Sequence, residues 1–167
     1  NDRKKTLVIG NIYAGTLRIS GNVDKAHDIY TFILTLAEEL GDERSVFTIT
    51  NNLAIIEAIR ANSEKALDRF LSTLESPIIQ ENPNFRYASY SNIALIYYEL
   101  QEYDKAIAYS KKGLNEEAPF LFQANSYVLL AKIARKMSDK NLIQYVMDHV
   151  PEHEYFETPK GQINKAD

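Results

Sequence analysis

The residues with the clearest chemical potential are two histidines near the C-terminal end. His149 and His153 are four residues apart, a spacing that brings two side chains to one face of a helix and could hold a metal ion. Pro151 lies between them and would end that helix, so we do not expect the pair to bind a metal. The sequence contains no cysteine, which excludes thiolate metal sites and disulfides.

Catalytic signatures are equally sparse. Glycine-rich phosphate loops, zinc-protease motifs and nucleophile elbows do not occur in the sequence. The acidic pairs Glu38-Glu39 and Glu116-Glu117 have the character of solvated helix ends rather than of an acid/base pair. We therefore predict that the chain is not an enzyme and uses no cofactor.

Asparagines at regular intervals are the more informative polar residues. The interval from Asn11 to Asn51 is the same as the interval from Asn52 to Asn92. Asparagine is a mediocre helix former because its amide competes for backbone hydrogen bonds, so its recurrence calls for a reason. Its amide both donates and accepts, as binding the backbone of an extended peptide requires. The alternative is that these amides bond neighbouring helices or face solvent.

The elements that position these asparagines follow a sequence repeat with a period of about 40 residues. Small residues mark it in two columns, twelve residues apart. The columns are Ala14, Ala54 and Ala94, then Ala26, Ala66 and Ala106. A fourth copy has Ala131, which follows Ala94 at a slightly shorter interval, and Ile143 replaces its second alanine. Three copies in register indicate a repeat architecture.

Each copy has the pattern of a helical hairpin. Apolar residues at helical spacing come first, as in residues 92–100, and a short polar break such as Ser20-Gly21-Asn22 follows. A second helical segment then begins near an acidic residue, which favours the positive end of the helix dipole. The paired alanines let the two helices, and the next hairpin, approach closely. The sequence therefore predicts an all-α fold.

The third copy, residues 90–119, resembles the tetratricopeptide repeat. The positions that carry the resemblance are Tyr90, Ile93, Ala94, Tyr97, Ala106, Tyr109 and, nearby, Pro119. Copies one and two depart from the pattern at Leu17 and Glu57, where the third has Tyr97. HEAT-type repeats are the alternative, because they also have a period of about 40 residues.

The resemblance implies a right-handed α-solenoid of about four hairpins within a repeat domain at residues 1–150. The expected repeats span residues 4–43, 44–83, 84–120 and 121–150, and a C-terminal cap or flexible tail follows at 151–167. The period exceeds the usual length of the family's repeat, which is about 34 residues. Longer second helices, such as the one expected over residues 24–43, account for the excess.

The junction Leu40-Gly41-Asp42 resembles that of long-period repeats in bacterial peptide-sensing transcriptional regulators. In those proteins the repeats follow a DNA-binding helix-turn-helix, and Asn1 in place of Met suggests a fragment with a domain missing upstream. The resemblance implies a cytoplasmic ligand-sensing or partner-binding module of a larger regulatory protein. The alternative is a scaffold or self-association domain that forms homodimers without a peptide ligand.

In the resembling family, the first helices of the hairpins line a groove that binds extended peptides or partner segments. Counting from the alanines predicts which side chains face this groove, and basic ones there could meet a ligand carboxylate. The predicted contact residues are Asn11, Arg18, Asn51, Asn52, Asn92, Leu95, Tyr98, Lys132 and Arg135. Most other tyrosines are expected in the core, including Tyr13, Tyr90, Tyr97 and Tyr109.

The composition narrows the class of partner. The net charge of -4 gives no reason to expect direct nucleic-acid binding, which usually needs a basic face. No apolar run approaches the roughly 20 residues that a membrane span needs. We expect a peptide or protein partner, and neither nucleic acid nor a membrane.

Overall fold

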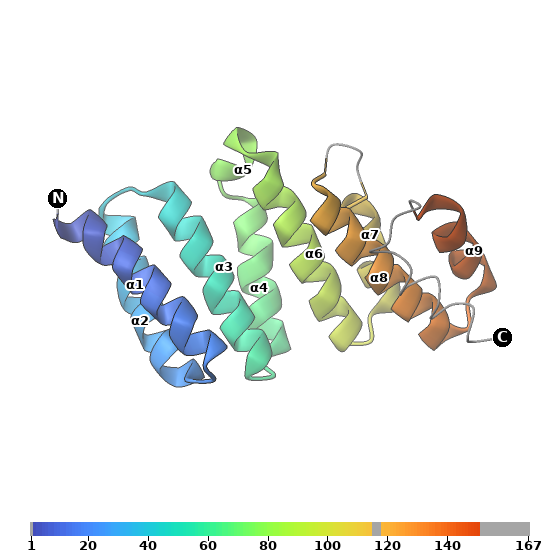
Figure 1. The fold of residues 1–167 in the computed structure, drawn as a ribbon, viewed down its shortest axis with the longest axis horizontal. Coiled ribbons are helices and arrows are strands. Elements are labelled where there is room, and N and C mark those ends of the chain that lie inside the picture. The colour runs from blue at the N-terminus through green and yellow to red at the C-terminus, as the bar shows by residue number, and fades with distance from the viewer. Residues whose placement is uncertain (1, 115–117, 151–167) are drawn as a thin grey trace. The chain divides into compact units, whose positions relative to one another are not determined.

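The computed structural model describes residues 2–114 and 118–150, and all regular elements in this part are α-helices (Figure 1). They are α1 (Asp2–Ile19), α2 (Val23–Glu39), α3 (Glu43–Ile59), α4 (Ser63–Leu74), α5 (Ile78–Glu81), α6 (Pro83–Glu99), α7 (Tyr103–Lys112), α8 (Phe120–Met137) and α9 (Lys140–His149). The predicted all-α helical repeat fold is confirmed. The predicted cap or tail at 151–167 lies outside the described residues.

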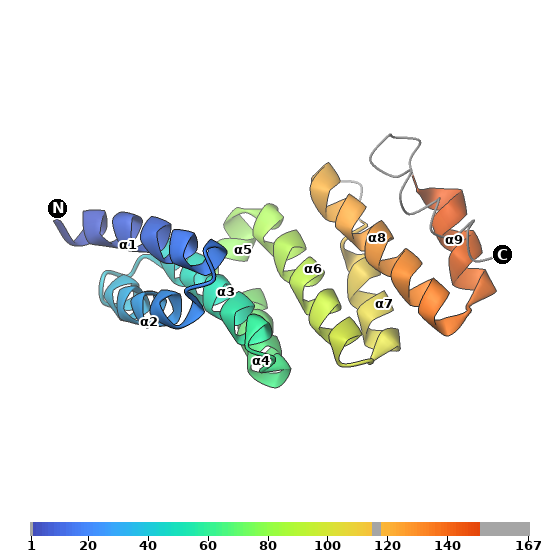
Figure 2. The ribbon, with the colours of Figure 1, turned by 60° about the horizontal axis from the view of Figure 1, so that its bottom comes forward.

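The helices group into two compact units, which we call unit 1 (up to Asn82) and unit 2 (from Pro83). In unit 1, α1 pairs with α2, α3 pairs with α4, and α3 also packs on α2 (Figure 2). In unit 2, α6 pairs with α7, α8 pairs with α9, and α8 packs on both α6 and α7. Within each unit, the two helices of a hairpin pack on each other and the next hairpin packs on them, as in a helical repeat.

The turns after five of the helices share one backbone conformation. Their left-handed residues, with φ between 53° and 83°, are Gly21, Gly41, Ala61, Gln101 and Ser138. In each turn the next N–H bonds to the carbonyl five residues earlier, over 2.8 to 3.0 Å. This arrangement satisfies carbonyls that the helix end leaves unpaired. The polar breaks predicted between helices are thus tight helix-ending motifs.

The acidic residues expected at the second helices lie at their N-terminal ends. Asp24, Glu64 and Asp104 occupy the first turns of α2, α4 and α7. Asp139 caps α9, because its Oδ1 accepts hydrogen bonds from the backbone N–H groups of Asn141 and Leu142 at 3.0 and 3.1 Å. A carboxylate in this position stabilises unpaired N–H groups and the positive end of the helix.

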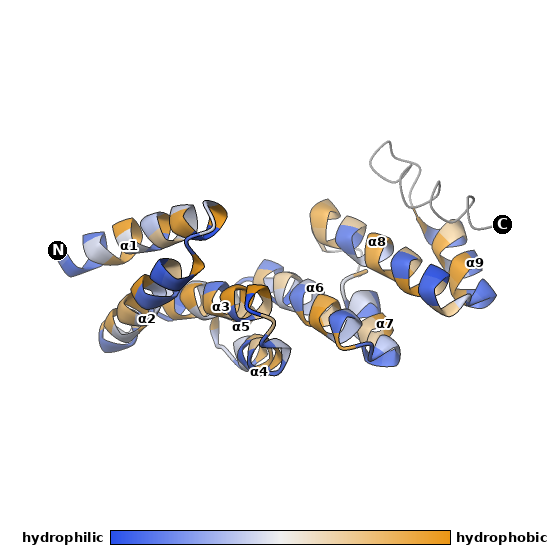
Figure 3. Ribbon diagram, turned by 90° about the horizontal axis from the view of Figure 1, so that it is seen from below, coloured by the Kyte–Doolittle hydropathy of each residue, from blue (hydrophilic) through white to orange (hydrophobic). Residues whose placement is uncertain are grey.

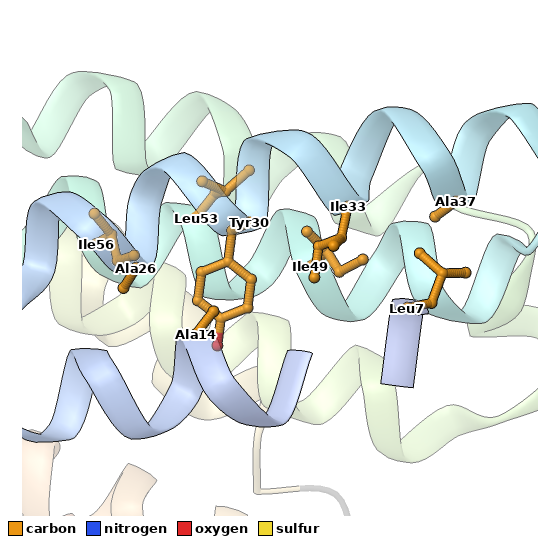
Figure 4. Close-up of a cluster of buried hydrophobic side chains, with 9 residues drawn as sticks. All are labelled: Leu7, Ala14, Ala26, Tyr30, Ile33, Ala37, Ile49, Leu53 and Ile56. Carbon is orange, nitrogen blue, oxygen red and sulfur yellow. The ribbon is translucent and has the colours of Figure 1, made fainter. Parts of the chain in front are cut away.

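Both alanine columns are buried, with no member above 2% exposure. In unit 1, Ala14 and Ala26 lie among the large side chains of α1, α2 and α3, where Tyr30 and Ile33 of α2 face Ala14 of α1 and Ile49 of α3 (Figure 4). The helices approach so closely that a Cβ added to Gly10 would lie 2.7 Å from Ile33. The alanines therefore serve the close packing that the repeat predicted.

The second repeat reaches its full length differently from our expectation. The second helix of the first hairpin, α2, is long, with 17 residues, but α4 has only 12. The end of the second repeat contains the additional short helix α5, which begins after Pro77 and ends before Pro83. Proline lacks an N–H and disfavours helix in the residue before it, so Pro77 and Pro83 divide this segment into separate helices.

Each described helix carries both apolar and polar residues (Figure 3). None of the described helices is long and apolar enough to cross a membrane. The buried residues of the described helices are mainly apolar.

Candidate binding surface

In unit 1, two predicted asparagines bond each other across the first helices. The Nδ2 of Asn52 on α3 donates a hydrogen bond of 3.3 Å to Oδ1 of Asn11 on α1, and both side chains are half-buried. Asn51 also has an interaction partner. Part of the hydrogen-bonding capacity of these amides therefore joins α1 to α3, which was the alternative interpretation of their spacing.

Arg18 is held against the core of unit 1. Its guanidinium lies close to the hydroxyl of Tyr30 on α2, while its Nε is buried without a partner among the described residues. Burial raises the pKa of Tyr30, and the neighbouring Arg18 charge opposes that rise. Arg18 is half-buried and covers the tyrosine hydroxyl instead of extending freely into solvent.

Unit 2 contains a cavity of about 260 Å³ lined by α6, α7 and α8. Three predicted contact residues line it: Asn92 and Leu95 from α6, and Lys132 from α8. The other lining residues are Ser91, Ala94, Ser110, Asn125, Ser126, Val128 and Leu129. Leu95 and Lys132 are exposed, whereas Ser110 and Ser126 are fully buried. The cavity therefore leads from the surface into the interior of unit 2.

A second depression, of about 540 Å³, adjoins this cavity through Lys132. Tyr98 of α6 and Arg135 and Lys136 of α8 complete its lining. The ring of Tyr98 is half-buried and its centroid lies 6.0 Å from that of Tyr103. The five contact residues predicted in this part of the chain thus line one continuous surface of α6 and α8, which we call the α6–α8 surface.

The α6–α8 surface is basic. Lys132, Arg135 and Lys136 lie within two turns of α8 and are all exposed. Among the described residues that line the cavity or the adjoining depression, none is acidic. The surface therefore favours an anionic ligand, although the whole chain has a net charge of -4.

Three serines are the site residues that the sequence prediction missed. The hydroxyl oxygens of Ser91, Ser110 and Ser126 are buried and have no hydrogen-bond partner among the described residues. All three line the cavity. A signal was present in the sequence, because Ser110 occupies the column in which the first two repeats have Tyr30 and Phe70.

The tyrosine predictions are confirmed for some positions and wrong for one. Tyr97 is buried, and its ring lies 5.6 Å from that of Tyr109, which is half-buried. Tyr90 is half-buried and lies 6.1 Å from Tyr109. Tyr13, expected in the core, is instead 55% exposed, because none of the described helices covers that face of α1.

The described residues contain no group of three or more histidine, cysteine or acidic side chains that could hold a metal ion. His149 is exposed at the end of α9, where its Nδ1 lies 2.8 Å from the carbonyl oxygen of Tyr145. His153 lies outside the described residues.

The fold is similar to several solved structures. BtubC (BKLC) from P. vanneervenii superposes with a TM-score of 0.74 at 20% identity, over 95% of this chain and 64% of that chain. The Pseudomonas aeruginosa PilF structure has a TM-score of 0.60 at 15% identity, over 93% and 66% of the two chains. Cut9, in the APC/C hetero-tetramer Cut9–Hcn1, has a TM-score of 0.54 at 17% identity, over 94% and 35%.

These similarities show an all-α helical repeat fold. No protein-family profile and no curated protein sequence matches the chain. The chain spans less than two thirds of the length of each of the three solved chains. At identities of 15 to 20%, what those proteins share with this one is architecture.

Proposed function

We propose that this protein is a protein-interaction module and that the α6–α8 surface binds a peptide or an extended segment of a partner protein. The tetratricopeptide-type fold supports this class of function, since stacked helical hairpins present side chains of successive first helices on one face. The observation that carries the proposal is the cavity, which brings Asn92, Leu95 and Lys132 together on two first helices.

The surface has the composition that peptide recognition requires. Leu95 is 47% exposed beside the cavity and offers an apolar contact. Tyr98 is a semi-rigid aromatic side chain next to Arg135. A central apolar or aromatic anchor with polar groups around it is the usual arrangement of an interaction site.

We propose further that the chain is the ligand-sensing or partner-binding part of a larger cytoplasmic regulatory protein. The support for this role is the resemblance of the Leu40-Gly41-Asp42 junction to the long-period repeats of peptide-sensing regulators. In unit 1, the predicted contact residues Asn11, Arg18, Asn51 and Asn52 remain a separate proposal and are not part of the α6–α8 surface; the Asn11–Asn52 hydrogen bond uses part of the capacity of two of these side chains.

The test is to select binders from a random peptide library displayed on phage and to measure affinity by fluorescence anisotropy. We expect the double variant Lys132→Ala/Arg135→Ala to bind the selected peptides more weakly, by about tenfold. The control Lys25→Ala/Lys140→Ala removes the same charge from two exposed lysines outside the surface. Equal affinities for both variants would refute the assignment of the α6–α8 surface.

Self-association is a second candidate function, favoured by the apolar face of α1. Val8, Ile9, Ile12 and Tyr13 are each more than half exposed. Ile9 and Tyr13 occupy the repeat positions that Ile49 and Leu53 occupy on α3. On α3 these positions are buried in the core of unit 1, together with side chains of α2. The α1 face is therefore suited to pack against a helix of a second copy. Sedimentation velocity of the Ile9→Glu variant tests this, because dimers that persist would exclude the face.

A further inference from the structure

The cavity in unit 2 has a cause in the repeat. Four residues after Ala26 and Ala66 stand the buried rings of Tyr30 and Phe70, but four residues after Ala106 stands Ser110. The third repeat thus has a hydroxymethyl group where the other two have an aromatic ring.

Two further replacements enlarge this difference. Ile33, seven residues after Ala26, corresponds to Gly113, seven after Ala106. Ile49, five residues before Ala54 on the helix that follows, corresponds to Ser126, five before Ala131. In unit 1, the three large side chains fill the space between α1, α2 and α3 (Figure 4). In unit 2, Ser110 and Ser126 line the cavity, and the Ser126 hydroxyl occupies the space beside Gly113.

The replacements are polar as well as small. Ser110 and Ser126 are 0% and 2% exposed, and their hydroxyls have no partner among the described residues. Gly113 allows this arrangement, because a Cβ there would collide with the Ser126 hydroxyl. Buried hydroxyls without hydrogen bonds destabilise a folded chain, and a ligand that accepts hydrogen bonds from them would remove that cost.

We infer that the cavity binds the side-chain carboxylate of an aspartate or glutamate in the peptide docked on the α6–α8 surface. The inference rests on the proposed function. The hydroxyls of Ser91, Ser110 and Ser126 each offer one O–H donor, and a carboxylate has about four acceptor positions. Lys132 supplies the opposite charge at the mouth, and no described lining residue is acidic.

The dimensions suit this ligand. A volume of about 260 Å³ is several times the roughly 30 Å³ that one water occupies in the liquid, so a side chain and its hydrogen-bonded waters fit. Arg135 and Lys136 continue the positive surface beyond the cavity. Neighbouring acidic residues of the same peptide would lie against them.

The probe is a fluorescein-labelled decapeptide of alternating glycine and glutamate, compared with the same peptide containing glutamine. We expect the wild-type protein to bind the glutamate peptide at least about tenfold more tightly, the scale of a buried charge-assisted interaction. Equal affinity for the two peptides would overturn the inference. Free glutarate is the third ligand, and if it bound more tightly than the peptide, the site would serve a small carboxylate instead.

Ser110→Phe places in the cavity the side chain that the second repeat has in this column. We expect it to reduce the preference for glutamate over glutamine to what the exposed basic side chains provide, while the protein unfolds at an unchanged or higher temperature. Ala108→Phe is the matched control, since Ala108 lies on the exposed face of the same helix. The variant Ser110→Ala/Ser126→Ala removes the two buried hydroxyls without adding volume, and we expect it to weaken glutamate-peptide binding as well.

These variants separate the two proposals. If Ser110→Phe and Ser110→Ala/Ser126→Ala retained wild-type discrimination while Lys132→Ala/Arg135→Ala lost binding, the α6–α8 surface would stand and the cavity inference would fall. If none of the variants changed the affinity, both would fall.

Discussion

Units 1 and 2 are built from the same repeat but use its interior differently. The space between α1, α2 and α3 is filled by Tyr30, Ile33 and Ile49, whereas the corresponding space between α6, α7 and α8 is a polar cavity. The alanines that set the helix spacing are buried in both. Helix spacing and cavity filling are therefore separable in this fold, and a few side chains convert a core into a candidate binding site.

The largest expected effect on stability comes from creating a cavity in the core of unit 1. Tyr30→Ser copies the side chain of the third repeat into the first, where the tyrosine is 1% exposed. Loss of a large buried aromatic side chain costs about 3–5 kcal/mol, and here the neighbouring Arg18 guanidinium also loses the hydroxyl beside it. Urea unfolding followed by circular dichroism measures the change. A loss below about 1 kcal/mol would show that the ring does not support the packing of α1 on α2.

A second contrast is electrostatic. Glu57 of α3 is 5% exposed, accepts a hydrogen bond of 2.8 Å from Nδ2 of Asn62 and lies 3.8 Å from Nε2 of His27. The hydrogen bond from Asn62 is the main cause that lowers the pKa of Glu57 below its ordinary value of 4.5. The third repeat has Tyr97 in this column, and its ring lies 5.6 Å from that of Tyr109.

Because the folded-state pKa of Glu57 is lowered, its stabilising effect is complete above about pH 4.5 and is lost as the pH falls through the folded-state pKa. We expect Glu57→Gln to destabilise unit 1 at neutral pH by about 1–2 kcal/mol and to reduce its sensitivity to acid. Hydrogen exchange of α3 between neutral and acidic pH measures both. An acid sensitivity of α3 that equals that of wild type would contradict this role.

Closing the cavity in unit 2 is expected to have a smaller effect of opposite sign. Ser110→Phe should raise the stability of unit 2 by about 0.5–2 kcal/mol, the usual range for filling a cavity. Hydrogen exchange of α6 and α7 measures it, with Ala108→Phe as the control on the exposed face of α7. A large loss of stability would mean that the cavity cannot accommodate the ring that Tyr30 and Phe70 place in the other repeats.

The smallest expected effects concern the turns, which the two units share. Ala61 and Gln101 are left-handed at φ of 60° and 61°, so glycine at either position relieves strain and should stabilise the protein by about 0.5 kcal/mol. Gly21→Ala is the reciprocal control, since no atom lies within 4 Å of the added Cβ and any loss is conformational. Thermal unfolding compares the three. A gain from Gly21→Ala would contradict the shared turn geometry.

The repeat made the architecture predictable from the sequence. Two alanine columns at a regular interval predicted helical hairpins, and the helix-ending turns fall at the predicted polar breaks. The asparagine columns were less informative. The structure bonds Asn11 to Asn52, which stand in different columns: the repeat-equivalent residue of Asn11 is Asn51. Periodicity identifies equivalent positions, but contacts form between positions that are not equivalent.

Tyr13 and Ser110 both show that burial cannot be predicted from residue type and repeat position. Tyr13 has the column and chemistry of a core residue, yet it is exposed, because burial depends on which helix packs against α1. Ser110 has the chemistry of a surface residue, yet it is fully buried, because its position on α7 faces α6 and α8. The type and spacing of a residue do not predict which side chains of neighbouring helices pack against it.

The sequence by itself determined the helices, their order and the small residues on which they cross, because these depend on local periodicity and on side-chain size. Only the tertiary structure decided that Lys132, Asn92 and three buried serines surround one cavity. That arrangement arises where three helices meet, and it depends on volume that the side chains of the third repeat do not fill.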